Sequence, residues 1–200
     1  MSADPASIPA SAVVDDARAE PAPATFVHLR VHSQYSLEDG LAKPAQLVAR
    51  ARELGMPAIA ITDWHNLFGL VKFYREANKA GIKPLVGADV RILSASRPEP
   101  HVATLLVADQ EGYLNLCRLI SRSFIEGRHQ GQPRVHEDWL TPEACVGLIA
   151  LTGWAGDVGQ ALAAGHPNEA QRRLGGWARR FPDRLYVELA RTGRSGEQAV

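Results

Sequence analysis

The chain has 200 residues, and 22 Lys and Arg balance 22 Asp and Glu, so its formal net charge at pH 7 is zero. Two hundred residues suffice for one domain with a sizeable core, or for most of a larger domain. The charge balance argues against a major DNA-binding surface, because phosphate binding relies on an excess of Lys and Arg.

The chain opens on a stretch, residues 1–25, that is rich in Ala, Pro, Ser and Asp and poor in bulky apolar side chains. Such a stretch cannot bury enough apolar surface to offset the entropy lost on ordering it. We therefore predict a disordered Ala/Pro-rich extension over residues 1–25, followed by one domain that begins at Phe26 and runs to residue 200.

Strand-like and helix-like segments alternate through the rest of the chain. The segments predicted as strands are 26–31, 57–61, 84–92, 102–108, 146–151 and 184–189. The segments predicted as helices are 44–54, 66–80, 110–126, 157–164 and 168–180. This alternation is typical of βα units, and it predicts an α/β fold with a largely parallel sheet.

Two of the predicted helices carry further signals. The helix at 66–80 has Asn66 in its N-cap region and Gly81 at its end. The helix at 168–180 carries a group of arginines, which either form a local basic patch or simply solvate one helix face. The second interpretation is the plainer one. These residues are Arg172, Arg173, Arg179 and Arg180.

The two cysteines, Cys117 and Cys145, lie in apolar contexts without the C-x-x-C spacing of a metal or redox pair. We therefore expect two buried thiols in a reducing cytoplasm rather than a disulfide. No apolar run approaches the roughly 18 residues of a membrane span, and the N-terminus lacks the pattern of a secretion signal. The sequence predicts a cytoplasmic protein without a membrane partner.

Titratable residues stand where the predicted strands between residues 26 and 89 give way to loops. His32 ends the first strand and Asp39 follows it, Asp63 follows the second strand, and Asp89 lies towards the end of the third. In barrel-like α/β folds, ligands and active sites collect at such strand ends. The pattern predicts a polar cluster of the metal-binding type.

Several stretches carry a resemblance to a known family. The main ones are FVHLRVHS at 26–33, LGMPAIAITD at 54–63 and AGIKPLVGAD at 80–89, with further matches at 111–116 and 181–184. They resemble the opening of bacterial replicative DNA polymerase III alpha subunits, which is their polymerase-and-histidinol-phosphatase (PHP) domain. The resemblance covers nearly everything that follows residue 25.

The resemblance implies a distorted (β/α)7 barrel. The predicted strands include no closing element, so we expect an incomplete barrel. Because family members continue for many hundreds of residues, we interpret residues 26–200 as a C-terminally truncated PHP domain. The implied parent enzyme is a DNA-directed DNA polymerase, a nucleotidyltransferase that adds deoxynucleotides to a primer 3′ end with Mg²⁺ during DNA replication.

The resemblance also implies a metal cluster that this sequence has lost. Metal-binding relatives have His-x-His where this chain has Arg30 and His32, and Asp-His where it has Asp63 and Trp64. A guanidinium has no lone pair to give a metal, and an indole only donates a hydrogen bond. A Glu of those relatives is matched by the shorter Asp89, which leaves an incomplete ligand set.

Trp154, after Thr152 and Gly153, stands at a further family position that is usually cysteine. The remaining potential ligands are His32, Asp39 and His101, besides Asp63 and Asp89. They form either a weak single-metal site or a hydrogen-bonded polar cluster. We favour the cluster because a fixed cation, Arg30, already sits among the carboxylates.

From this interpretation we predict no catalytic residue, no metal and no cofactor in this segment. Arg30 is expected to lie within hydrogen-bonding distance of Asp39, Asp63 or Asp89, with His32 and His101 nearby. Arg30 would then replace the metal as the cation of the cluster.

Two further histidines lie close to these positions in the sequence. His28 alternates with Arg30 and His32, so strand alternation predicts that all three side chains share one face. His28 either lines the mouth of the cluster or is a satisfied structural histidine, which is the commoner fate. His65 follows Trp64 by one position and is expected to point elsewhere.

Three functions remain open. The first is a structural PHP domain of a replicative polymerase, whose implied partners are the proofreading exonuclease subunit, other replicase subunits and, through the missing polymerase region, DNA and deoxynucleotides. The second is a free-standing PHP-family metal-dependent phosphoesterase or 3′–5′ exonuclease, which would require Arg30 and Trp64 to be ligands. The third is a pure interaction module.

Overall fold

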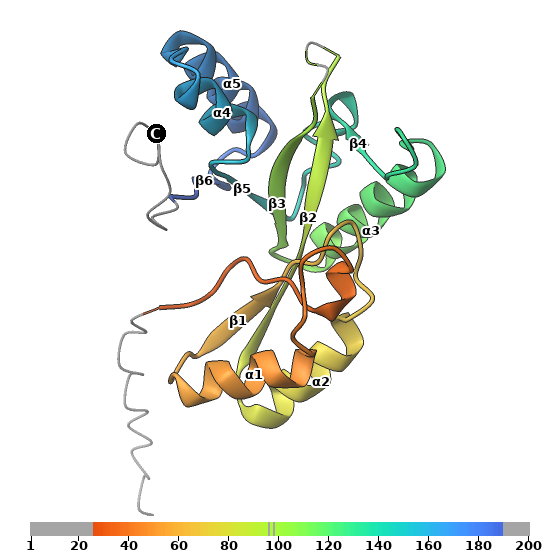
Figure 1. Ribbon diagram of the computed structural model, residues 1–200, viewed down its shortest axis with the longest axis vertical. Coiled ribbons are helices and arrows are strands. Elements are labelled where there is room, and N and C mark those ends of the chain that lie inside the picture. The colour runs from red at the N-terminus through yellow and green to blue at the C-terminus, as the bar shows by residue number, and fades with distance from the viewer. Residues whose placement is uncertain (1–25, 96, 98, 190–200) are drawn as a thin grey trace, which may run out of the picture.

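The structure, a computed structural model, describes residues 26–95, 97 and 99–189 (Figure 1). The predicted disordered extension, residues 1–25, lies outside the described part of the chain. In chain order the elements are η1 (Gln34–Ser36), α1 (Pro44–Glu53), β1 (Ala58–Ile61), α2 (Leu70–Ala80), β2 (Lys83–Leu93), β3 (His101–Val107), α3 (Gln110–Ile125), β4 (Val135–His136), η2 (Glu137–Trp139), β5 (Leu148–Thr152), α4 (Asp157–Ala163), α5 (Pro167–Arg180) and β6 (Leu185–Val187). None of the described helices is long and apolar enough to cross a membrane.

A six-stranded sheet organises the domain, in the order β1-β2-β3-β5-β6, with β4 paired to the far end of β2. The pairs β1–β2, β2–β4 and β5–β6 are parallel, whereas β3 runs antiparallel to both β2 and β5. This parallel-rich α/β architecture confirms the predicted fold class. The β2–β3 pair is antiparallel, and only residues 94–100 connect the two strands. Through the described residues the sheet runs open from β1 to β6.

The long strand β2 joins the two halves of the molecule (Figure 1). Its first half, residues 83–86, pairs with β1, and a core that includes Phe73 packs α1 and α2 against that pair. Its second half, residues 87–92, pairs with β3 above a core shared with α3 and α5. At the change of partner, a Cβ on Gly87 would lie 2.6 Å from the carbonyl oxygen of Leu105, so only glycine fits there.

The prediction of a continuous strand at 26–31 is wrong. Only His28 in this segment forms a bridge to β1. The backbone N–H of Ala60 donates to the carbonyl of His28, and that of Thr62 donates to the carbonyl of Val31, both at 2.8 Å. The segment thus advances three residues, from His28 to Val31, while the neighbouring strand advances only two, from Ala60 to Thr62. The extra residue breaks the ladder as a β-bulge does and redirects the side chains that follow His28.

Helix α2 begins at Leu70 instead of residue 66. The side chain of Asn66, expected near the N-cap, accepts the backbone N–H of Phe68 at 3.0 Å and donates to the carbonyl of Tyr35 at 2.9 Å. These bonds hold residues 66–69 in a turn that competes with the helix. The end of the helix is as predicted, because Gly81 adopts a φ of 72° and stops it.

Candidate functional site

The buried carboxylate of Asp89, on β2, is the centre of a polar cluster. Its Oδ2 atom accepts a hydrogen bond from Nε of Arg30 at 2.6 Å and lies 2.9 Å from Nε2 of His32. Its Oδ1 atom accepts a hydrogen bond from the hydroxyl of Thr104, on β3, at 2.5 Å. The Asp89 side chain is wholly buried, whereas that of Arg30 is 30% exposed. The contact predicted between Arg30 and at least one of three aspartates is confirmed.

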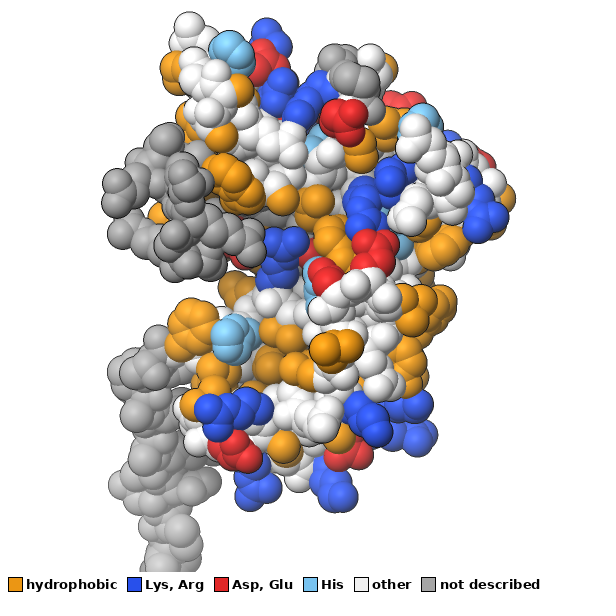
Figure 2. Space-filling view, viewed as in Figure 1, with side chains coloured by type: hydrophobic (Ala, Val, Ile, Leu, Met, Phe, Trp, Pro, Cys, Tyr) orange, Lys and Arg blue, Asp and Glu red, His pale blue; other side chains and the backbone are white. Residues whose placement is uncertain are grey.

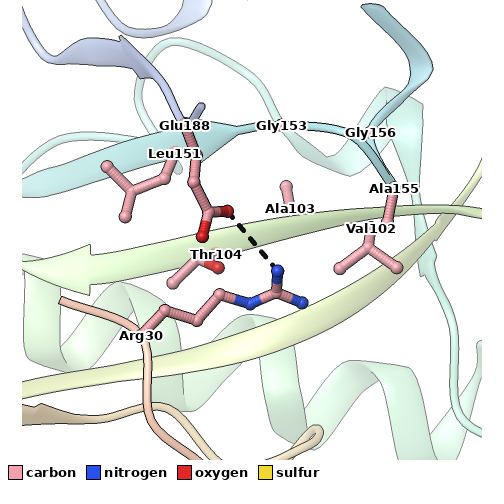
Figure 3. Close-up of a pocket in the computed structure, with 9 residues that line it drawn as sticks. All are labelled: Arg30, Val102, Ala103, Thr104, Leu151, Gly153, Ala155, Gly156 and Glu188. Carbon is pink, nitrogen blue, oxygen red and sulfur yellow. Dashed lines mark hydrogen bonds and ion pairs between the residues drawn. The ribbon is translucent and has the colours of Figure 1, made fainter. Parts of the chain in front are cut away.

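A second carboxylate, that of Glu188, approaches the guanidinium of Arg30. Nη1 of Arg30 lies 3.4 Å from Oε2 of Glu188, as the dashed line in Figure 3 marks. Glu188 follows β6, and its backbone N–H donates to the carbonyl of Thr152 at 2.8 Å. Burial on its own lowers the pKa of Arg30, but Asp89 and then Glu188 outweigh it and raise the pKa. The guanidinium is therefore held charged between two carboxylates.

His32 links Asp89 to a third carboxylate, that of Asp39. Nδ1 of His32 lies 2.9 Å from both carboxylate oxygens of Asp39. Burial lowers the pKa of His32, but the hydrogen bonds and charges of Asp89 and Asp39 outweigh burial and raise it. An imidazolium donates from both ring nitrogens, which suits a ring flanked by two carboxylates. The two carboxylates therefore favour the protonated form of His32.

Trp64 contributes a hydrogen-bond donor at the rim of the cluster. Its Nε1 atom donates to Oδ2 of Asp39 at 3.1 Å, and its ring lies 5.1 Å from that of His32 between centroids. Burial raises the pKa of Asp39, but the hydrogen bonds from Trp64 and His32 outweigh burial and lower it. The indole therefore stabilises the charged form of a carboxylate that the imidazole also holds.

Asp63 belongs to a separate hydrogen-bond network, in which its donors are neutral groups. Its Oδ1 atom accepts the backbone N–H of Ser33 at 2.6 Å and the hydroxyl of Ser36 at 2.9 Å, and its Oδ2 atom accepts the hydroxyl of Ser33 at 2.8 Å. Ser33 is the N-cap of η1 and Ser36 is its last residue. Within the described ranges, Asp63 has no ion pair with Lys, Arg or His. The signal for these partners is the Ser-x-x-Ser spacing after the first predicted strand.

Neither His101 nor Trp154 lines the cavity beside Arg30. His101 lies on β3 three residues before Thr104, so strand alternation turns its side chain to the opposite face. Its Nε2 atom lies 4.0 Å from Oδ1 of Asp157. Trp154 is 42% exposed at the surface. The expectation that His101 lies near Arg30 is therefore wrong, because the type of a residue does not show on which face of a strand its side chain lies.

His28 lines a cavity together with Arg30 and Val31. Its ring meets that of Phe26 edge-on, with 4.8 Å between centroids. The alternation from which a shared face of His28, Arg30 and His32 was predicted is interrupted by the extra residue. His65 is buried, and its Nε2 atom accepts the backbone N–H of Arg91 at 2.7 Å. Burial and then the charge of Arg91 lower the pKa of His65 to about 3, so its imidazole is neutral at pH 7.

The donor set does not suit a divalent metal. The Oδ2 atom of Asp89 already binds two cationic groups, and Trp64 offers only a donor. The cavity beside Arg30, which Glu188 and Thr104 help to line, measures about 10 Å³, room for about one water (Figure 3). Among the described residues, no group of three or more His, Cys, Asp and Glu is arranged to hold a metal ion. The geometry favours a structural ionic cluster.

The chain is similar to known proteins over most of its length. A family model described as the PHP domain matches residues 28–192. The DNA polymerase III subunit alpha of Escherichia coli K12 is 48% identical over 176 residues, which are 87% of this chain and 15% of the relative. That of Pseudomonas fluorescens is 45% identical over 179 residues, 88% of this chain and 15% of the relative. The chain thus spans about 15% of the length of these curated relatives.

Among solved structures, a putative metal-dependent phosphoesterase from Bifidobacterium adolescentis matches 82% of this chain and 85% of its own chain. The identity is 12% and the TM-score is 0.48. A likeness at this level supports no inference about activity.

Proposed function

The chain belongs to the PHP domain family, and we propose that it forms the N-terminal PHP domain of a replicative DNA polymerase alpha subunit, where it serves as a structural scaffold. The observation that carries this proposal is the hydrogen-bonded ion pair between Arg30 and Asp89. Metal-dependent hydrolysis needs His and carboxylate ligands that converge on cations. Here a guanidinium stands among the carboxylates, so the cluster holds the fold together.

The energetics of buried carboxylates support a scaffold. Carboxylates gathered in one pocket repel one another and do not all stay ionised without a compensating cation. Arg30 and His32 supply that charge to Asp89 from inside the chain. The contacts of Arg30 join residues that are 59 and 158 positions away in the sequence. The cluster therefore fixes the first described segment against β2 and against the residue that follows β6.

We place the polymerase chemistry in regions outside this chain. By family resemblance, the parent enzyme is a cytoplasmic nucleotidyltransferase that adds deoxynucleotides to a primer 3′ end, with Mg²⁺ held by carboxylates elsewhere in the protein. The two relatives are named as alpha subunits of DNA polymerase III. The partners we propose are therefore the proofreading exonuclease subunit and other replicase subunits, together with DNA.

A free-standing phosphoesterase or 3′–5′ exonuclease of the same family is the second candidate. It requires a metal at the position where Arg30 donates to Asp89, and a ligand where Trp64 donates to Asp39. Neither side chain has a lone pair to give. No specific contact of the cluster favours this candidate.

Elemental analysis and a hydrolysis assay on the purified protein test the proposal together. We expect no stoichiometric Zn²⁺ or Mn²⁺ and no hydrolysis of p-nitrophenyl phosphate when either ion is added. Arg30→His is the matched variant, because it restores one ligand type while Trp64 still leaves a gap in the shell. A tightly bound transition metal in the unaltered protein, or metal-dependent hydrolysis by it, would contradict the scaffold.

Two further assays test the wider proposal. The chain should give no templated primer extension, because the polymerase carboxylates lie elsewhere. A pull-down with the purified proofreading exonuclease subunit should retain the chain. Failure of that pull-down would leave a scaffold without the proposed partner contact and would remove the exonuclease subunit from the partners.

A further inference from the structure

A second polar cavity, of about 210 Å³, lies between α5 and the connection from β2 to β3. Figure 2 shows Lys and Arg side chains gathered in this region, at the top of the molecule. The cavity is lined mainly by charged groups. Five are arginines, Arg97, Arg172, Arg173, Arg179 and Arg180, and three are carboxylates, Glu137, Asp157 and Glu169. The remaining lining residues include His101.

Each carboxylate of this cavity already has donors. Glu137 accepts a hydrogen bond from Arg180 at 2.8 Å, and Glu169 accepts one from Arg173 at 2.7 Å. Asp157 Oδ1 accepts the backbone N–H of the next residue and an indole N–H from α5, both at 2.9 Å. Glu137 and Glu169 are therefore each paired with an arginine, and five arginines against three carboxylates leave a formal excess of two positive charges.

Several donors that line the same cavity remain free. Nη1 of Arg97 is buried without a hydrogen-bond partner, while its Nη2 donates to Oε1 of Gln160. Arg179 is exposed and pairs with no carboxylate in the described part of the chain. His101 is 1% exposed, and its Nδ1 atom has no partner. Buried polar atoms without partners are rare in proteins because each one loses its bonds to water.

We propose that this cavity binds a phosphate group, either the free ion or the monoester end of a nucleotide. A tetrahedral oxyanion offers acceptors in several directions and would satisfy the free donors of Arg97 and Arg179 at once, and it would accept from Nδ1 of His101 in the tautomer that carries the proton there. The planar guanidinium matches phosphate geometry, and the charge of the ligand would balance the positive excess. The cavity is smaller than the roughly 300–1,000 Å³ of sites for drug-sized ligands, which favours the phosphate itself over a whole nucleotide as the buried part.

This site is distinct from the Arg30 cluster and does not rest on the scaffold role. His101 faces away from Thr104 on β3, and Thr104 is the residue through which that strand contacts Asp89. The two polar groups therefore lie on opposite faces of one strand. Binding of phosphate and the stability of the Arg30 cluster can be measured independently.

The experiment is a calorimetric titration with sodium phosphate at fixed ionic strength, with chloride as the balancing anion. We expect saturable binding with one site per chain. Arg97→Gln and Arg179→Gln should each weaken it about tenfold, which corresponds to about 1.4 kcal/mol. Arg75→Gln is the matched control, because it removes an exposed helix arginine on α2 that does not line the cavity.

The absence of saturable binding would overturn the proposal. An equal loss in all three variants would also overturn it, since it would show only a non-specific response to net charge. Competition separates the two sources of phosphate. Displacement by deoxyadenosine 5′-monophosphate but not by deoxyadenosine supports a monoester, and displacement by neither, with phosphate still bound, supports the free ion.

Discussion

Two buried aspartates, Asp63 just after β1 and Asp89 within β2, are held in opposite ways. Asp63 accepts hydrogen bonds from two serine hydroxyls and one backbone N–H, all of them neutral donors. Asp89 accepts from Arg30 and the hydroxyl of Thr104, and it contacts His32. Their side chains are almost equally buried, so burial alone does not decide which one needs a cation.

The difference lies in the neighbourhood of each carboxylate. Asp39 and Glu188 also contact the groups that hold Asp89, so negative charge accumulates around it. Asp63 stands apart from these carboxylates and is satisfied by local donors around η1. An isolated buried carboxylate is stabilised by two or three neutral hydrogen bonds, whereas a group of them requires positive charge. We therefore expect the stability of Asp89 to depend on nearby cations, and that of Asp63 to depend on the placement of its neutral hydrogen-bond donors.

The largest effect should come from Arg30→Ala. It leaves Asp89 buried without its main cation, and removal of one partner of a buried pair costs about 3–5 kcal/mol. Since Arg30 is partly exposed, we expect about 3 kcal/mol in urea unfolding, at the low end of that range. Arg50→Ala is the control, because its pair with Glu53 is exposed and such pairs contribute at most about 1 kcal/mol. Equal effects of the two substitutions would show that Asp89 does not depend on Arg30 as its cation.

The two aspartates can be compared directly by the same substitution. Asp89→Asn should cost about 2 kcal/mol, since bonds to charged groups contribute about 1.5–3 kcal/mol. Asp63→Asn should cost about 1 kcal/mol, because an amide can still accept from Ser33 N–H and donate to a hydroxyl oxygen. Urea unfolding of both variants measures the difference. A greater loss at Asp63 would contradict the division into a cationic and a neutral site.

A smaller effect should appear as a dependence of stability on pH. The folded pKa of His32 is raised above its unfolded value, because bonds to Asp89 and Asp39 outweigh burial. A raised pKa means that its contribution is complete below about pH 6.5 and is lost as pH rises through the folded value. His32→Gln should flatten the stability curve in that window. His65 has a folded pKa of about 3, so it changes the dependence of stability on pH only below about pH 6.5. It therefore does not contribute in the window of His32.

The smallest effect is expected at Glu188. It lies 3.4 Å from Arg30, and both side chains are about one third exposed. Glu188→Gln should therefore change the free energy of unfolding by only about 0.5 kcal/mol, as for other solvent-exposed pairs. Thermal unfolding of this variant beside Asp89→Asn would show which carboxylate Arg30 depends on. A larger loss of stability in Glu188→Gln than in Asp89→Asn would show that Glu188, the residue after β6, is the main partner of Arg30.

The chemistry of single residues made part of the site predictable from the sequence. The guanidinium of Arg30 has no lone pair for a metal, and as a permanent cation it was expected to pair with an acid. It pairs with Asp89. The face of a strand on which each side chain lies was not predictable in the same way. The bulge after His28 breaks the alternation on which a shared face depended, and His101 falls on the far face of β3.

The missed partners depend on pairing between distant strands. Thr104 reaches Asp89 only because β3 pairs with β2 in the register that sets these two residues opposite each other. Glu188 reaches Arg30 only through the pairing of β6 with β5. No local pattern in the sequence encodes either register, because register is set by the assembled sheet.

A double-mutant cycle between Arg30 and Asp89 measures whether these two side chains stabilise the fold as a pair. The free energies of unfolding are measured for the unaltered protein, Arg30→Ala, Asp89→Asn and the double variant, with a chelator present throughout. If Arg30 is the cation of the cluster, the double variant should be about 2 kcal/mol more stable than the sum of the single losses predicts, within the range for contacting residues. Losses that add within about 0.5 kcal/mol, as for independent sites, would contradict the account.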